Sequence, residues 1–200
     1  MNSSLNELLV SDYAPVLRSA FSDLREDVLY KSFVHGVGHV RRVMVLGAII
    51  AMQQRIPLYD ARLLLYACAY HDIGRKNDAV DDLHGERGAD MLTPGLFHAS
   101  TDEMACVKAA IAAHSTADGE IDRFIVKYCV PACMEGRCVF LSKCLKDADN
   151  LDRVRLGDLN LDYLRFSESK NLKALAEELF LEIRGEGILW QRFLYDLKRA

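Results

Sequence analysis

The sequence A-C-A-Y-H-D-I-G-R at residues 67–75 decides how this 200-residue chain is interpreted. It joins His71 to Asp72 at the end of a stretch whose apolar residues recur every three or four positions, as in an amphipathic helix. Burying an unpaired imidazole and carboxylate is costly, and a divalent metal ion removes that cost. Gly74 is a typical helix stop. The pattern therefore predicts a helix that ends in a metal-binding His-Asp pair.

Helical periodicity extends along most of the chain, and no run of strict apolar-polar alternation lies between turn residues. Residues 115–136 are punctuated by Gly and Pro and predict a loop with one short helix. The sequence thus predicts a single all-α domain over residues 1–200. The expected helices cover residues 5–17 with a break near Pro15, about 38–55, 57–74, 83–92, 101–114 and 137–152, with one or two more in 172–197.

The composition narrows the classes of protein. Half of the residues are apolar and 27% are charged, which is ordinary for a globular chain and excludes disorder. The net charge of −4 argues against nucleic acid as the main partner, because phosphate-binding domains are usually basic. The longest apolar run, residues 43–52, is too short to span a bilayer, and the first residues show no secretory pattern. We therefore expect a cytoplasmic protein that has no membrane partner.

The six cysteines lack the tight C-x2-C pair of a structural zinc site, although four of them fall within residues 129–144. A reducing compartment and small buried apolar side chains are the simpler interpretation.

Other histidines and aspartates stand at the ends of predicted helices. His35 and His39 form H-G-V-G-H before an apolar helix, His84 opens H-G-E-R-G-A, and His114 closes the helix before it. His98 has no such context. Mixed nitrogen and oxygen donors suit Mn, Fe, Ni, Co, Zn or Mg.

The segment K-D-A-D-N-L-D offers three aspartates on one predicted helix. At 100° per residue, Asp147 and Asp152 lie closer to the apolar stripe than Asp149 does. Periodicity alone leaves all three as candidates. The stripe comprises Phe140, Cys144, Ala148 and Leu151.

Taken in order, H-x3-H-V-x-R-V, Y-H-D-I-G-R, H-G-x-x-G-A, I-x-x-H-S and D-A-D-x-L-D resemble the HD-domain superfamily of metal-dependent phosphohydrolases, here as a small stand-alone member. The resemblance runs from about His35 to Arg155. It implies an all-α bundle of about five core helices around a metal site, with a core at about residues 33–156. Residues 157–200 would complete the bundle or form an interface, such as a homodimer face.

The resemblance also implies a ligand set. His39, His71, Asp72 and Asp149 match the positions that hold the first ion. His84 and His114 match the additional histidines of members with two ions. Asp149 is thereby selected over Asp147 and Asp152. His35 stays open between a ligand, a neighbour of a ligand and a helix-start residue.

The activity that the resemblance implies is phosphomonoester or phosphodiester hydrolysis of a nucleotide or another small phosphorylated substrate. The ions would supply hydroxide as the nucleophile, with Asp72 bridging them. Arg75 departs from the resemblance, since many members have Lys there; its planar guanidinium would bind phosphate in a cationic rim with Lys76, Arg153 and Arg155, and a solvated charged surface is the alternative. His84, His114 or Asp147 would protonate the leaving oxygen.

Two alternatives keep the same fold. Some proteins that resemble this superfamily use a di-iron pair for oxygen chemistry, and the six ligands named above would hold such a pair. A non-catalytic nucleotide-binding module is the other alternative, although none of the expected ligands is missing from this sequence.

Overall fold

The structure is a computed structural model that describes residues 2–184 and 187–200. Within these residues it is all-α and contains no β-strand, which confirms the predicted fold class. The α-helices are α1 (Ser3–Leu9), α2 (Tyr13–Ser22), α3 (Val37–Gln53), α4 (Leu58–Tyr70), α5 (His84–Met91), α6 (Thr101–His114), α7 (Ile121–Lys127), α8 (Glu135–Leu151), α9 (Ser167–Lys170), α10 (Lys173–Arg184) and α11 (Ile188–Leu197). Short 3-10 turns are η1 (Glu26–Val28), η2 (Asp118–Glu120), η3 (Ala132–Met134), η4 (Asp152–Arg155) and η5 (Leu161–Tyr163).

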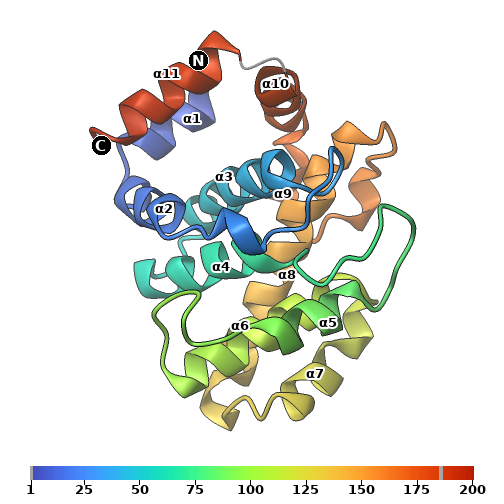
Figure 1. Cartoon of the computed structure of the whole chain (residues 1–200). Helices are drawn as coiled ribbons and strands as arrows, with labels where there is room; N and C mark the ends of the chain where they lie inside the picture. Colours follow the sequence, from blue (N-terminus) through green and yellow to red (C-terminus); the bar gives the residue numbers. More distant parts are fainter. Residues whose placement is uncertain (1, 185–186) are drawn as a thin grey trace.

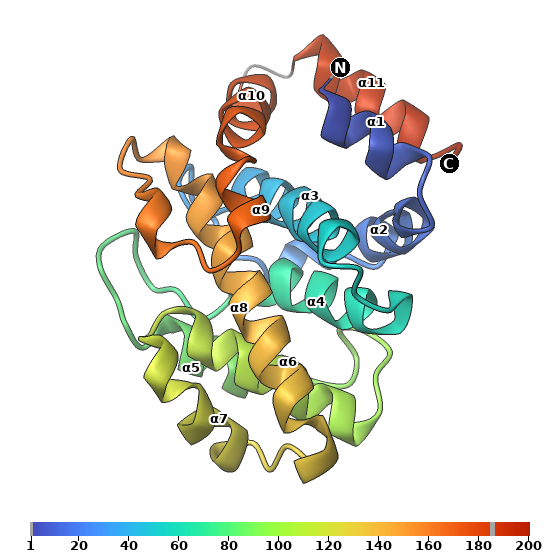
Figure 2. The ribbon, with the colours of Figure 1, turned by 180° about the vertical axis from the view of Figure 1, so that it is seen from behind.

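Helices α3, α4, α6 and α8 pack against one another in the middle of the molecule (Figure 1). Helix α3 carries the longest apolar run of the sequence, and residues 43–51 are buried on all sides. A helix that is apolar all round is expected in this position, because no face of it can be left to water. Helices α5, α6 and α7 gather at one end of the bundle, and α1, α10 and α11 gather at the other (Figure 2).

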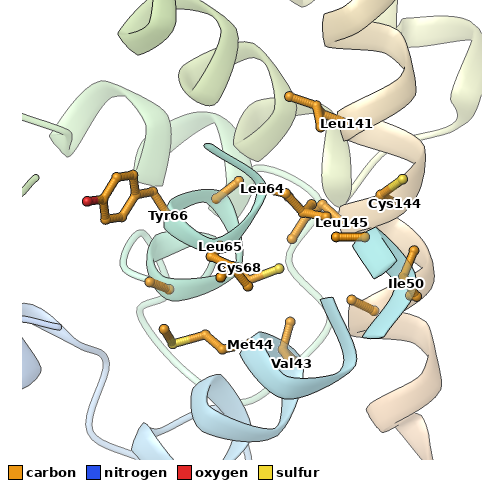
Figure 3. Packing of buried hydrophobic residues seen from close by; sticks show 14 of the residues in the cluster. Val43, Met44, Ile50, Leu64, Leu65, Tyr66, Cys68, Leu141, Cys144 and Leu145 are labelled. Carbon is orange, nitrogen blue, oxygen red and sulfur yellow. The ribbon is translucent and has the colours of Figure 1, made fainter. Parts of the chain in front are cut away.

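Side chains of three helices meet in the core (Figure 3). Val43 and Met44 of α3 lie across from Leu65 and Cys68 of α4, and Leu145 of α8 closes the cluster. Cysteines take part in this packing: four of the six are buried, and all six are free thiols. The two at residues 129 and 133 are exposed, so the expectation of buried cysteines is correct for four of them.

The ends of the chain fold back on the bundle. Helix α11 contacts α1 and α2, and the indole of Trp190 meets Phe21 edge-on and stacks on Phe193. The break in the first helical stretch falls at residues 10–12 rather than at Pro15. Pro15 lies in the first turn of α2 instead, where its missing N–H costs no helical hydrogen bond.

The segment at residues 115–136 is more helical than the sequence predicted, since η2, α7 and η3 fill much of it. Across the described residues, no helix combines the length and apolar character needed to cross a bilayer.

Candidate metal centre

Helix ends bring six predicted ligands into one cluster. Asp72 and five other residues converge from segments that are far apart in the sequence. His39 lies in the first turn of α3, His71 and Asp72 follow α4, His84 begins α5, His114 ends α6, and Asp149 is near the end of α8. Three overlapping donor groups result: His39, His71 and Asp72; His71, His114 and Asp149; Asp72, His84 and His114.

The four imidazoles share one orientation. Each ring places Nδ1 against an acceptor outside the cluster, and carbonyl oxygens cannot donate, so Nδ1 carries the proton. The Nε2 lone pairs are therefore directed into the cluster. The acceptors are Asp152 Oδ2 for His39 (2.7 Å), the Cys68 carbonyl for His71 (2.8 Å), the Ile111 carbonyl for His114 (2.6 Å) and the Asp81 carbonyl for His84.

The Nε2 atoms face each other in two pairs. His39 and His71 bring theirs to 3.0 Å, and His84 and His114 bring theirs to 2.9 Å. Two lone pairs at this separation repel each other unless a proton or a cation lies between them. Ligand atoms about 2.1 Å from one tetrahedral ion lie about 3.4 Å apart. The spacing of the nitrogens is close to that of ligands to a shared ion.

Asp72 lies between the two imidazole pairs. Its Oδ2 is 3.5 Å from Nε2 of His39 and 3.6 Å from Nε2 of His71. Its Oδ1 is 3.1 Å from Nε2 of His84 and 3.8 Å from Nε2 of His114. One carboxylate thus serves both pairs, one oxygen to each.

Asp149 adds a second oxygen to the first pair. Its Oδ1 is 3.3 Å from Nε2 of His39 and 3.7 Å from Nε2 of His71. The buried Oδ2 of Asp72 accepts no hydrogen bond from any described residue. An unpaired buried carboxylate oxygen is expensive, and a cation compensates it. These residues therefore fit one or two divalent ions.

The protonation states of His71 and Asp72 agree with metal binding, whereas His39 would first have to release a proton. Burial and the charge of Arg155 lower the pKa of His39, but the nearby carboxylates of Asp149, Asp152 and Asp72 raise it to about 9, so metal binding at its Nε2 would displace a proton. Burial lowers the pKa of His71 to about 3, against the attraction of Asp72 and Asp149. Burial alone would raise the pKa of Asp72, yet the charge of His71 and the close approach of the other three histidines hold it well below its usual range. Asp72 is thus ionised and His71 neutral, as metal coordination requires.

Asp152 supports the cluster from outside. It is fully buried, and besides His39 it accepts Nε of Arg42 (2.6 Å), Nη2 of Arg42 (2.9 Å) and Nη1 of Arg155 (3.3 Å). It is therefore a neighbour of a candidate ligand. Sequence reasoning missed Arg42, although its position three residues after His39 places both on one face of α3.

Asp147 does not join the cluster. It is buried and accepts the backbone N–H groups of Arg165 (2.9 Å) and Phe166 (3.1 Å). The Arg165 side chain continues to Asp118, which also accepts Nζ of Lys146 (2.8 Å). Asp147 thus ties the chain after η5 to helix α8 and lies away from the proposed chemistry.

A cavity of about 890 Å³ opens over the cluster, with His84, His114 and Asp149 in its wall. Of the four predicted rim cations, Arg75 and Arg153 line this cavity, whereas Lys76 and Arg155 do not. Nε of Arg75 donates to Oδ1 of Asp72 (2.9 Å).

His35 also lines the cavity, and His98 does not. Nδ1 of His35 lies 2.9 Å from Oδ1 of Asp78, and His35 is in none of the donor groups. Of the roles left open for His35, the structure therefore favours a place beside the ligands.

No known protein-family profile matches this chain, and no curated protein matches it. Among solved structures, it is similar to the crystal structure of a predicted HD superfamily hydrolase from an uncultured Thermotogales bacterium. The two share 23% sequence identity with a TM-score of 0.48, over 98% of this chain and 99% of that chain.

Proposed function

We propose that this protein is a metal-dependent phosphohydrolase that acts on a nucleotide or another small phosphate ester. The observation that carries the proposal is the pairing of four inward Nε2 atoms around the shared carboxylate of Asp72, beside an open cavity. Divalent ions held by these residues would lower the pKa of a bound water and neutralise charge on phosphoryl oxygens.

Arg75 is suited to orient the phosphate. Its Nε is engaged by Asp72, which fixes the guanidinium beside the donor cluster, and the side chain lines the cavity. A guanidinium held this way presents its outer N–H groups to a phosphate oxygen in a planar fork. It also stabilises the charge that the phosphoryl group carries during transfer.

His35 is suited to transfer a proton: burial lowers its pKa, so Nε2 can take up the proton that the attacking water loses and then pass it to the leaving oxygen. Asp78 engages its Nδ1, and Oγ of Ser32 donates to Asp78 (2.6 Å), so Nε2 is the nitrogen left to serve a ligand. His84 and His114 direct their Nε2 atoms into the donor cluster. We therefore assign proton transfer to His35 in place of the residues expected from the sequence.

The cavity agrees with a small substrate. Its volume of about 890 Å³ falls in the range of sites for small organic ligands. Tyr163 and Val80 line it and are 69% and 94% exposed, so they offer apolar surface to the part of the substrate away from the phosphate. Arg153 adds a cation to the same wall.

The test combines metal analysis with phosphate release from a panel of nucleotides and simple phosphate esters. We expect bound divalent metal and turnover in the wild type, and loss of both in Asp72→Ala and Asp149→Asn. Asp147→Asn is the matched control on the same helix and should keep its metal and its turnover. Proton donation by His35 predicts that His35→Gln keeps its metal but loses turnover.

Three outcomes would contradict the proposal. Turnover that survives in metal-free Asp72→Ala would separate the activity from the cluster. Oxygen consumption by iron-loaded protein without phosphate release would favour the di-iron alternative. Tight nucleotide binding without turnover under every metal tested would favour a binding module.

A further inference from the structure

A second cavity, of about 350 Å³, lies beside the metal centre. Its wall includes residues 32–34, the first turns of α3, residues 155 and 156, and Phe180 of α10. Leu156 is the one residue that it shares with the larger cavity, and none of the candidate metal ligands lines it. It is therefore a separate site whose contents need not be the substrate.

Two buried cations line this second cavity. The side chains of Arg42 and Arg155 are only 5% and 6% exposed. Within residues 2–184 and 187–200, Asp152 is the only carboxylate that pairs with either of them, and the remaining wall residues are uncharged. Two guanidinium groups thus share one ion-pair partner; the charge of Asp149 also acts on Arg155 from the metal centre, where bound ions would neutralise it. Burying an uncompensated charge is costly, so an anion in this cavity would be stabilising.

The guanidinium groups retain donors for such an anion. Arg42 uses Nε and Nη2 for Asp152, while Arg155 uses Nε for the Val34 carbonyl (3.0 Å) and Nη1 for Asp152. Nη1 of Arg42 and Nη2 of Arg155 make no hydrogen bond to any part of the chain that the structure describes. Guanidinium N–H groups form strong, charge-assisted hydrogen bonds with carboxylate and phosphate oxygens.

The rest of the wall is largely apolar and partly aromatic. Phe33 is 97% exposed, and Leu156 is 44% exposed. The Phe180 ring lies 5.3 Å from the guanidinium carbon of Arg42. An exposed phenyl ring beside buried cations suits a ligand that has an apolar body and one anionic group.

We propose that this second cavity binds a small organic anion. Its carboxylate or phosphate meets Arg42 and Arg155, and its apolar body lies against Phe33 and Phe180. The proposal goes beyond phosphate ester hydrolysis and does not depend on it, because it concerns binding at a cavity that contains none of the metal ligands.

The experiment titrates the metal-loaded protein with benzoate and with phenylphosphonate, using calorimetry and amide NMR. Benzyl alcohol, which keeps the ring without the charge, and acetate, which keeps the charge without the ring, are the matched ligands. We expect saturable binding of both aromatic anions, with shifted amide signals at residues 32–38 and 155–156. The two matched ligands should bind at least about tenfold more weakly, because each lacks one of the two contacts.

Variants locate the binding. Arg155→Met should weaken benzoate binding by about tenfold or more, since a charge-assisted hydrogen bond is lost. Phe33→Ala keeps the fold, because its ring is almost fully exposed, and should weaken binding by about threefold to tenfold. Val126→Ala, at another exposed apolar position, should leave binding unchanged. Asp149→Ala, which should lose its metal, is compared with metal-free wild type and should bind benzoate as that protein does, because Asp149 does not line this cavity.

Either of two results would overturn the proposal. One is the absence of saturable binding at millimolar benzoate. The other is binding that disappears in Asp149→Ala but survives in both Arg155→Met and Phe33→Ala, which would place the anion at the metal centre.

Discussion

Replacing Asp152 by asparagine removes the negative charge that joins the metal centre to the cations behind it. Four hydrogen bonds reach this carboxylate, one from His39, two from Arg42 and one from Arg155, at 2.6–3.3 Å. Asp152 and its three partner residues are nearly or fully buried. Burial would raise the pKa of Asp152, but its hydrogen bonds with His39 and Arg42 hold the pKa below its ordinary value, so the group is ionised.

The loss of stability expected for Asp152→Asn follows from this burial. Breaking a buried ion pair from one side destabilises a protein by about 3–5 kcal/mol. The asparagine still accepts through its carbonyl oxygen, so we expect the free energy of unfolding to fall by about 3 kcal/mol, the lower end of this range. For a chain of this length, that shift lowers the melting temperature by roughly 6–12 °C. Loss of the negative charge that orients His39 should also weaken metal binding by about 10- to 100-fold.

Urea denaturation and metal titration measure the two effects separately. Asp122→Asn, an exposed aspartate on α7, is the matched control and should lie within about 0.5 kcal/mol of the wild type. An Asp152→Asn variant with the stability of this control and unchanged metal affinity would refute the role assigned to Asp152.

Three further predictions follow from particular contacts. Gly74→Ala should destabilise the protein by about 3 kcal/mol or more in thermal melts, because the added Cβ would overlap backbone atoms of α5. Gly136→Ala is the control: its Cβ meets no atom within 4 Å, so this variant should be neutral or stabilising. Hydrogen bonds with Arg165 lower the pKa of Asp118, so their contribution is present above the unfolded-state pKa of about 3.9 and is lost as pH falls. Urea melts at several acidic pH values should therefore show that the free energy of unfolding depends less on pH in Asp118→Asn than in the wild type. The same pH dependence in both proteins would contradict this prediction. Ser100→Ala removes one half of a capping box and should cost about 1 kcal/mol in the same melts; no measurable loss would show that the cap contributes little.

The three aspartates of K-D-A-D-N-L-D show where sequence reasoning reaches its limit. Periodicity ranks positions by their distance from an apolar stripe, so it favoured Asp147 and Asp152, and both are indeed buried. It does not indicate what a buried carboxylate lies against. Asp147 meets the backbone after η5, Asp152 meets two arginines and Nδ1 of His39, and Asp149 reaches the cluster. Helix α8 also ends at Leu151, so Asp152 belongs to the 3-10 turn η4 and an ideal helical wheel does not describe it.

The sequence by itself determined the all-α class, the positions of most helices and the set of His and Asp residues worth examining. These features can be predicted from short-range spacing, because helical periodicity and helix-end residues depend on neighbours three or four positions away. Only the tertiary structure decided which nitrogen of His39 faces inward, because Asp152, 113 positions away, accepts from its Nδ1. For His71 and His114 the acceptors of Nδ1 are local, the carbonyls of Cys68 and Ile111 three residues earlier. The tertiary structure also decided that Lys76 and Arg155 lie outside the larger cavity and that two arginines share one carboxylate. The contacts of Arg42 with Asp152 and of Arg155 with the Val34 carbonyl join residues more than a hundred positions apart, and no local pattern encodes them.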